Sequence, residues 1–236
     1  MILFGIILFL AGGLRAQEPV EIENSVSVYP SSLPALWRRS VRLVLTDQAP
    51  QRVCPQENRG FKTLGHKAAG KLAYELEASG ARLSVSETQT ALRASWAAWA
   101  RHGAIPALEG AISSEPLSSV FAHDRRNSVS WQPLSPFSSD TLVAVQLLID
   151  REKGKLMEFD IALNAEVSWA TGKGPLPALS YDVQSALTTA FGFVLGLGEV
   201  RDSAACGSAL YPFLRSGDRT RRILGEGDKE AIRKIY

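Results

Sequence analysis

Groups that bind metals or act as nucleophiles are few in this chain of 236 residues, which has three histidines, two cysteines and two methionines. No two of His66, His102 and His123 are spaced as H-x-x-x-H, so no helix can present two imidazoles to one metal ion. The pair His123-Asp124 superficially resembles a structural metal site, but we expect these histidines to be solvated loop residues. The spacing supports no Ser-His-Asp or Cys-His arrangement either.

An excess of charge of one sign is also lacking, because the formal net charge is only +2. There is therefore no bulk electrostatic case for binding nucleic acid or an anionic membrane. The run of charge at residues 219–222 is short and is interpreted as solvated surface.

An apolar run does occur at residues 2–14, but its 13 residues are too few to span a hydrocarbon core, which takes about 20. The run fits the apolar region of a secretory signal peptide, with cleavage after Leu14-Arg15-Ala16. We therefore expect a signal peptide at residues 1–16 and a secreted or cell-envelope protein. The alternative is an uncleaved membrane anchor, which is the only membrane contact that the sequence suggests.

The two cysteines, Cys54 and Cys206, are far apart in the chain. In an exported protein an even count favours a disulfide, which would close a very long loop here. Two separate buried thiols are the alternative, since sequence alone cannot place the two Cβ atoms together. Cys206 is interpreted as a structural residue in either case.

The apolar fraction of 45% allows one sizeable core. Residues 17–36 are expected to be an N-terminal extension, where Pro30 and Pro34 prevent regular structure. Residues 37–236 are expected to form one α+β domain with helices packed on a mixed, twisted sheet. Periodicity predicts strands at 41–45, 72–76, 127–131, 142–149 and 156–164, helices from 86 to 102, 181 to 195 and 229 to 236, and irregular connections at 48–70 and 170–179. The strands at 142–149 and 156–164 form the clearest hairpin.

Capping residues mark where the helices begin. They are Ser86-Glu87-Thr88-Gln89, interpreted as a capping box, then Ser180 or Asp182, and finally Asp228. Leu92, Trp96 and Trp99 share one face of the first helix, which is more typical of a core than of a binding platform. Gly192 lies inside the second helix at a cost of about 1 kcal/mol against alanine, which predicts close packing or a local turn there.

The end of the second helix carries the most informative motif, Thr189-Ala190-Phe191-Gly192-Phe193-Val194-Leu195-Gly196-Leu197-Gly198-Glu199. This stretch resembles the metzincin zinc helix, H-E-x-x-H-x-x-G-x-x-H, in its glycine and leucine skeleton. The three histidine positions fall on Thr189, Phe193 and Glu199. The glutamate position falls on Ala190, and the linking glycine is present as Gly196.

Five further fragments occur in the order and spacing of a matrixin-type metzincin, particularly the secreted bacterial form. They are Val129-Ser130-Trp131, residues 154–164 (like G-x-I-x-x-A-D-I-x-L-N), residues 181–187 (like Y-D-L-Q-S-V-A), residues 208–212 (like the Met-turn S-x-M-Y-P, with Leu210 for methionine) and residues 228–236 (like D-x-x-A-I-x-x-L-Y). The resemblance runs from about residue 37 to the end. It implies a mixed twisted sheet with two long helices, a short C-terminal helix, and zinc as the family's cofactor.

The departures from the motif remove the chemistry that the resemblance would imply. A catalytic zinc needs three protein ligands and an open position. Thr189 is a poor zinc donor and Phe193 has no donor atom, so Glu199 is left alone. At Ala190 a methyl group stands where the general base would be. We therefore predict no catalytic residues, no bound metal and no cofactor: a pseudoenzyme of the zinc metalloendopeptidase family.

Several alternatives remain at this point. Asp150 and Asp160 are candidates for calcium, but no ligand series accompanies them. A zinc metalloendopeptidase with atypical ligands is the enzymatic alternative, and an envelope protein tethered by residues 2–14 is a structural one. For the pseudoenzyme we expect an unidentified protein or peptide partner, which could add as a strand at an open sheet edge. Phe193 is predicted to be buried, which would close the former metal position.

Overall fold

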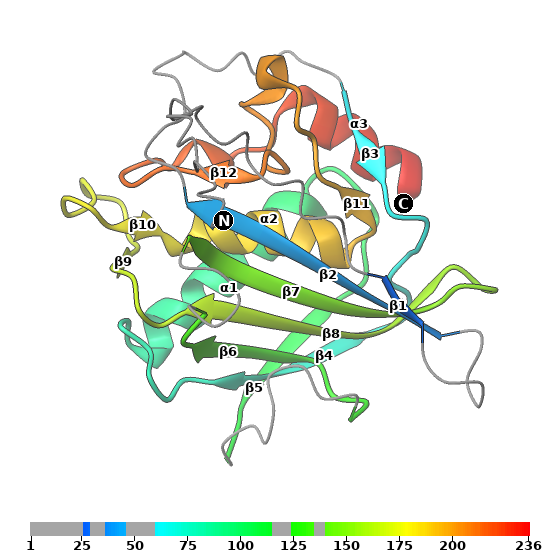
Figure 1. The fold of residues 1–236 in the computed structure, drawn as a ribbon, viewed down its shortest axis with the longest axis horizontal. Helices are drawn as coiled ribbons and strands as arrows, with labels where there is room; N and C mark the ends of the chain where they lie inside the picture. The colour runs from blue at the N-terminus through cyan, green and yellow to red at the C-terminus, as the bar shows by residue number, and fades with distance from the viewer. Residues whose placement is uncertain (1–25, 29–35, 46–59, 115–123, 135–139) are drawn as a thin grey trace, which may run out of the picture.

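The computed structural model describes residues 26–28, 36–45, 60–114, 124–134 and 140–236. The predicted signal peptide, Cys54 and His123 therefore lie outside the described residues. The principal sheet has the order β1-β2-β7-β8-β6-β4-β5, and β12 also pairs with β2 (Figure 1). Its strands are β1 (Val26–Val28), β2 (Leu36–Leu45), β4 (Leu72–Glu77), β5 (Leu108–Ile112), β6 (Ser128–Gln132), β7 (Thr141–Asp150), β8 (Lys155–Asn164) and β12 (Phe213–Leu214).

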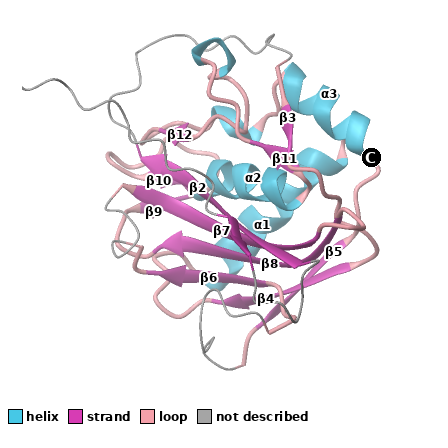
Figure 2. Ribbon diagram, turned by 45° about the vertical axis from the view of Figure 1, so that its right-hand side comes forward, coloured by secondary structure: helices cyan, strands magenta, loops and turns pink. Residues whose placement is uncertain are grey.

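Two small pairings and three helices complete the described elements. β3 (Lys62–Thr63) pairs with β11 (Leu197–Gly198), and β9 (Trp169–Ala170) pairs with β10 (Tyr181–Asp182). The helices are α1 (Val85–Ala100), α2 (Val183–Val194) and α3 (Glu226–Ile235), with short 3-10 turns η1 (Ser203–Ala205) and η2 (Thr220–Arg222). The helices lie to one side of the principal sheet (Figure 2).

The sheet is mixed, as the sequence predicts. β4 runs parallel to β5 and β6, and β6 runs parallel to β8. β7 is antiparallel to both β8 and β2. The hairpin of β7 and β8 and the α+β class are therefore confirmed.

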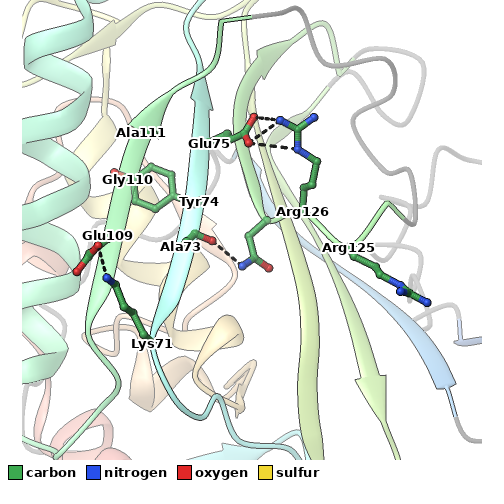
Figure 3. A pocket seen from close by; sticks show the side chains of 10 residues that line it. Lys71, Ala73, Tyr74, Glu75, Glu109, Gly110, Ala111, Arg125 and Arg126 are labelled. Carbon is green, nitrogen blue, oxygen red and sulfur yellow. Dashed lines mark hydrogen bonds and ion pairs between the residues drawn. The ribbon is translucent and has the colours of Figure 1, made fainter.

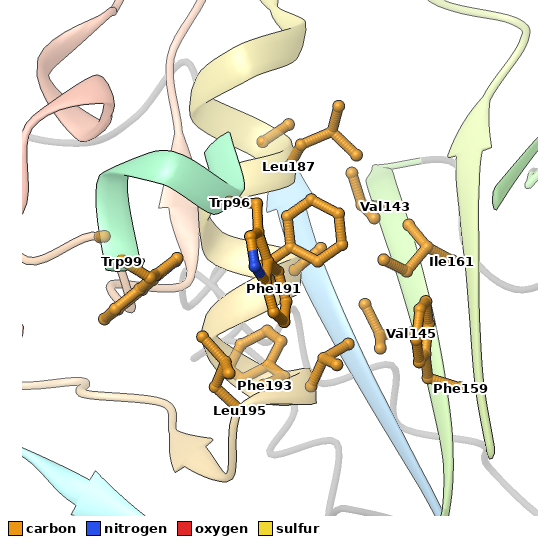
Figure 4. Close-up of a cluster of buried hydrophobic side chains, with 14 of the residues drawn as sticks. Trp96, Trp99, Val143, Val145, Phe159, Ile161, Leu187, Phe191, Phe193 and Leu195 are labelled. Carbon is orange, nitrogen blue, oxygen red and sulfur yellow. The ribbon is translucent and has the colours of Figure 1, made fainter. Parts of the chain in front are cut away.

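The core lies between the sheet and the helix pair (Figure 4). Trp96 of α1 packs edge-on against Phe191 of α2, with ring centroids 5.1 Å apart. Trp99 is fully buried and its indole N–H donates to the carbonyl of Thr188 at 2.9 Å. The tryptophans are therefore core residues, as predicted. Because Trp99 also bonds to the backbone of α2, the pair fixes α1 against α2.

Helix starts differ from the sequence prediction in two places. The capping box of α1 is formed by Ser84 and Glu87, two residues before the predicted one, because Glu87 can then reach back to the Ser84 N–H at 2.9 Å. α3 begins at Glu226 after the N-cap Gly225, and Asp228 lies inside its first turn. Asp182 caps α2 through the Ser185 N–H, which settles the choice between Ser180 and Asp182.

The predicted irregular extension contains residues of two strands. Val26–Val28 forms β1 within the predicted irregular extension, and β2 begins at Leu36. β2 pairs with β7 along its length and takes β1 and β12 on its other side. The edge of β7 is therefore occupied, and among the described strands β5 forms the opposite end of the sheet.

Candidate functional site

Three of the four motif positions that carry zinc chemistry in the family lie in the interior and not at a surface. Thr189, Ala190 and Phe193 of α2 are 0%, 1% and 1% exposed. The Thr189 hydroxyl donates to the carbonyl of Ala209 at 2.5 Å, closer than to Ser185 in its own helix at 3.3 Å. A threonine here therefore ties α2 to the turn beneath it, where the motif would have a metal ligand.

A buried arginine lies beside this threonine. The Arg221 guanidinium donates to the Thr189 hydroxyl at 3.4 Å and to the carbonyl of Phe213. Burial lowers the Arg221 pKa to about 10, and the charges of Asp218 and Asp228 partly offset this effect. The side chain thus remains charged at pH 7. The prediction that residues 219–222 are solvated surface is wrong for this residue.

Arg222, the next residue, also forms a structural ion pair. The guanidinium reaches both oxygens of the buried Asp182 carboxylate, at 2.8 and 2.5 Å. Asp182 is the N-cap of α2, so this ion pair holds the start of the helix against η2, whose last residue is Arg222. The run of arginines at residues 219–222 is visible in the sequence, but the sequence does not show which of these side chains point inward.

The turn at residues 208–211 lies directly beneath α2. The carboxylate of Asp228 accepts hydrogen bonds from the Ser208 hydroxyl at 2.6 Å and from the Ala209 N–H at 2.8 Å. It also accepts from the Gly225 N–H at 2.9 Å. Asp228 therefore joins the turn to α3. Burial raises its pKa, and these hydrogen bonds oppose the shift.

Leu210, at the methionine position of the turn, packs against Gly192 of α2. It is fully buried. A Cβ on Gly192 would lie 2.5 Å from Leu210 Cδ2 and 2.8 Å from Trp99 Cζ2. Gly192 therefore serves close packing, which was one of the two expectations for it.

Gly192→Ala is expected to destabilise the protein by about 1 kcal/mol. Overpacking costs about 1–3 kcal/mol, and the better helix propensity of alanine returns about 1. Leu210→Ala in the same chain should relieve part of the clash, so the two changes should not add. Gly174→Ala is the control, because a Cβ at that position would meet nothing within 4 Å. Urea unfolding followed by circular dichroism gives the free energy of unfolding of the parent and of the four variants, and strict additivity of Gly192→Ala and Leu210→Ala would contradict the contact.

Gly196 ends the helix in the way the linking glycine of the motif suggests. Its φ is +91°, and a Cβ there would lie 2.0 Å from the carbonyl oxygen of His66. His66 is itself buried, with Nε2 3.3 Å from the carbonyl of Val194. The prediction of a solvated loop residue is therefore wrong for His66. His102 is partly exposed, and burial together with nearby cations lowers its pKa.

Glu199 is the one remaining candidate ligand of the motif. It follows β11, and only 16% of its side chain is exposed. Its carboxylate forms an ion pair with the Arg201 guanidinium. In the described part of the chain, no group of three or more histidine, cysteine, aspartate or glutamate side chains is arranged to hold a metal ion.

The two calcium candidates do not come together. Asp150 ends β7, where the Lys153 N–H donates to it at 3.1 Å and the Lys153 ammonium lies 3.3 Å away. Asp160 on β8 lies opposite Gln146. Asp150 and Gln146 are four residues apart on one strand, which corresponds to about 13 Å at roughly 3.3 Å per residue. These two carboxylates cannot share one ion in this fold.

Asp160 has an unusual environment of its own. It is 4% exposed and accepts a hydrogen bond from the Ser128 hydroxyl at 2.5 Å. Burial raises its pKa to about 8, the Ser128 bond opposes this, and the carboxylates of Glu158 and Asp124 add to the rise. The folded protein therefore holds a proton on Asp160 at neutral pH, whereas the unfolded chain does not.

This difference predicts a pH dependence of stability. Because the folded pKa is raised, the contribution of Asp160 is fully present below about pH 4 and is lost as pH rises to about 8. The advantage of Asp160→Asn over the parent should therefore grow between pH 4 and 8 and then level off. Asp150→Asn is the contrast, since backbone N–H donors lower the Asp150 pKa and its contribution is lost as pH falls. Unfolding in urea from about pH 2 to about pH 9 measures both, since the Asp150 contribution is lost below about pH 4. A flat difference for Asp160→Asn between about pH 4 and 8 would contradict the assignment.

An open pocket of about 540 Å³ lies over β4 and β5 on the face of the sheet that bears Ala73 and Glu75 (Figure 3). An ion pair bounds it on each side: Lys71 with Glu109 at 2.6 Å, and Glu75 with Arg126 at 2.5 Å. Between them, the Asn127 amide donates to the carbonyl of Ala73 at 2.6 Å. The Arg125 side chain points away from both pairs. No sequence motif indicated this pocket, because its residues come from separate strands.

Cys206 is disulfide-bonded, which agrees with the expectation of a structural role. The chain's other cysteine, Cys54, lies outside the described residues. None of the described helices is both long enough and apolar enough to cross a membrane. No protein-family model matches the chain, and no curated protein matches it in sequence.

Proposed function

We propose that this chain is a secreted, matrixin-like protein that has lost its zinc ligands and general base, and that it acts by binding a protein or peptide. The observation that carries the proposal is the closed packing at the motif positions. Ala190 and Phe193 are buried among apolar side chains, and a charged guanidinium lies against Thr189. Apolar side chains occupy these positions, and the nearby guanidinium would repel a metal ion.

The matrixin-like part of the proposal rests on the motif fragments and on their positions in space. The degenerate zinc helix is α2, and the linking Gly196 follows its end. The turn that carries Leu210 contacts this helix at Thr189 and Gly192. The mixed sheet with two longer helices and a short last helix is what the resemblance implies.

The metal test uses the mature chain from residue 17, which keeps β1 and β2. Elemental analysis after growth with added zinc is expected to find far less than about one zinc per chain. Cleavage of quenched fluorescent peptides should not exceed that of buffer. The alternative, a zinc endopeptidase with atypical ligands, depends on Glu199. It would be supported by stoichiometric zinc that is lost in Glu199→Ala.

The binding part of the proposal is directed to the pocket over β4 and β5. Its rim has charged and amide groups, and the small side chains of Ala73 and Ala111 line its floor. Peptides are first selected from a displayed library for binding to the mature chain. These peptides should bind the Arg126→Met variant at least tenfold more weakly than they bind the parent. Arg201→Met is the matched control, because it also breaks an ion pair but lies outside the pocket lining. Equal losses in both variants would show that the selected peptides bind elsewhere.

Export itself rests on residues 2–14 alone. Mass spectrometry of the N-terminus after expression in a secreting host distinguishes a cleaved signal peptide from a retained anchor. A mature chain that begins near residue 17 is the expected result.

A further inference from the structure

The end of the sheet formed by β5 is an exposed strand. Its residues from Glu109 to Ile112 are exposed, and the large apolar residue Ile112 is 56% exposed. β5 pairs with β4 on one side, and no described strand pairs with its other side. Such an edge presents backbone donors and acceptors to any strand that can align with it.

The usual protections of an edge strand are missing from β5. The strand Leu108–Ile112 contains no proline and no lysine. Its single charge, on Glu109, is neutralised by Lys71 at 2.6 Å. At its centre, Gly110 has no side chain, and the Tyr74 ring lies in that space, 2.1 Å from where a Cβ would be. The Tyr74 ring therefore covers the middle of the strand on one face, and Gly110 adds no side chain that would hinder another strand from approaching the edge.

The sequence of β5 is complementary to itself when two copies run antiparallel about Gly110. Leu108 then lies opposite Ile112 of the second copy, and Ile112 opposite its Leu108, which gives two apolar cross-strand pairs. Glu109 lies opposite Ala111, so no like charges meet. Centring the pair on Glu109 would instead place two carboxylates opposite each other. A two-fold axis between the two Gly110 residues therefore gives each residue of the strand a compatible partner in the other copy.

The apolar pairs also continue into the fold. Leu108, Gly110 and Ile112 share one face of β5, since side chains alternate along a strand. Tyr74 covers Gly110 on that face. Two facing edges would thus bring Leu108, Tyr74 and Ile112 of each copy into one apolar strip, and Ile112 would be covered.

We infer that the β5 edge pairs antiparallel with the β5 edge of a second copy of this chain, centred on Gly110, so that the two sheets become continuous. This inference goes beyond the proposed function. No motif residue of α2 takes part in it, although Glu109, Gly110 and Ala111 of β5 also line the pocket over β4 and β5.

Sedimentation equilibrium of the mature chain tests the association. A dimer is expected, and Ile112→Lys should weaken it at least tenfold by placing a charge opposite Leu108. Met157→Lys is the matched control, since Met157 is a 49% exposed apolar residue on another strand. A wild-type chain that stays monomeric at the highest soluble concentration would overturn the inference. So would a dimer that Ile112→Lys leaves intact.

Cysteine cross-linking tests the register and remains decisive if Ile112→Lys fails to fold. Directly opposite residues in an antiparallel pair have Cα atoms about 4.5–5.5 Å apart, which suits a disulfide. Mixing Glu109→Cys with Ala111→Cys should give a cross-linked dimer on mild oxidation, whereas each variant alone should remain largely uncross-linked. Equal cross-linking in the single variants would rule out pairing centred on Gly110.

Discussion

Phe193→Ala is expected to lower the free energy of unfolding by about 3–5 kcal/mol, the usual cost of emptying a buried phenylalanine site. Phe193 is 1% exposed and lies beside Leu195 in the core next to α1 and the sheet (Figure 4). Its removal leaves a cavity that the neighbouring side chains can fill only in part. Urea unfolding at constant m-value measures the loss.

Two further variants calibrate this result. Phe191→Ala, two residues earlier and fully buried, should cost a similar amount. Met157→Ala, at a 49% exposed position, should change stability by less than about 0.5 kcal/mol. A loss below about 1 kcal/mol for Phe193→Ala would mean that this side chain lies in an open cleft, and the closed-site interpretation would then fail.

The second large effect concerns restoring a metal. Thr189→His, Phe193→His and Glu199→His together should create zinc affinity, because the helix retains the spacing of two ligands on one face. The structure adds a condition to this expectation. The Arg221 guanidinium lies 3.4 Å from the Thr189 hydroxyl. Two unit charges 4 Å apart interact by about 4 kcal/mol at an effective dielectric constant of 20, and a divalent ion roughly doubles this repulsion.

Adding Arg221→Met to the triple variant should therefore raise zinc affinity at least tenfold, measured by competition with a chromophoric chelator. Arg219→Met in the same background is the control: it removes the same charge from a guanidinium that bonds the carbonyls of Lys173 and Gly174. Ala190→Glu would then supply the missing base and weak peptidase activity. If zinc does not bind even without Arg221, the scaffold is not preserved as the resemblance implies.

The sequence was most informative where a pattern is local. The hairpin of β7 and β8, the apolar face of α1 and the break at Gly196 follow from alternation, helical periodicity and glycine at positive φ. Helix starts were less certain, because several serines and acids near position 86 can each cap a helix. The fold confirms the class, mixed α+β, and leaves the family as a proposal.

The parts that sequence could not supply depend on distant contacts. Arg221 looks like a surface residue in a basic run, and only the packing of η2 against α2 buries it. His66 becomes buried because the chain passes the end of α2 there. The pocket over β4 and β5 combines strands and a loop that no single window of sequence contains.

The position of β2 has a consequence for how the protein is made. This strand leaves the ribosome first among the long strands, yet Val44 pairs with Thr141 of β7 and with Phe213 of β12. The sheet cannot be completed until nearly the whole chain has been synthesised, and such non-local pairing is intrinsically slow. Until β7 has been synthesised, β2 lacks its long antiparallel partner and is open to aggregation. We therefore expect the chain to complete its folding only after it has left the ribosome.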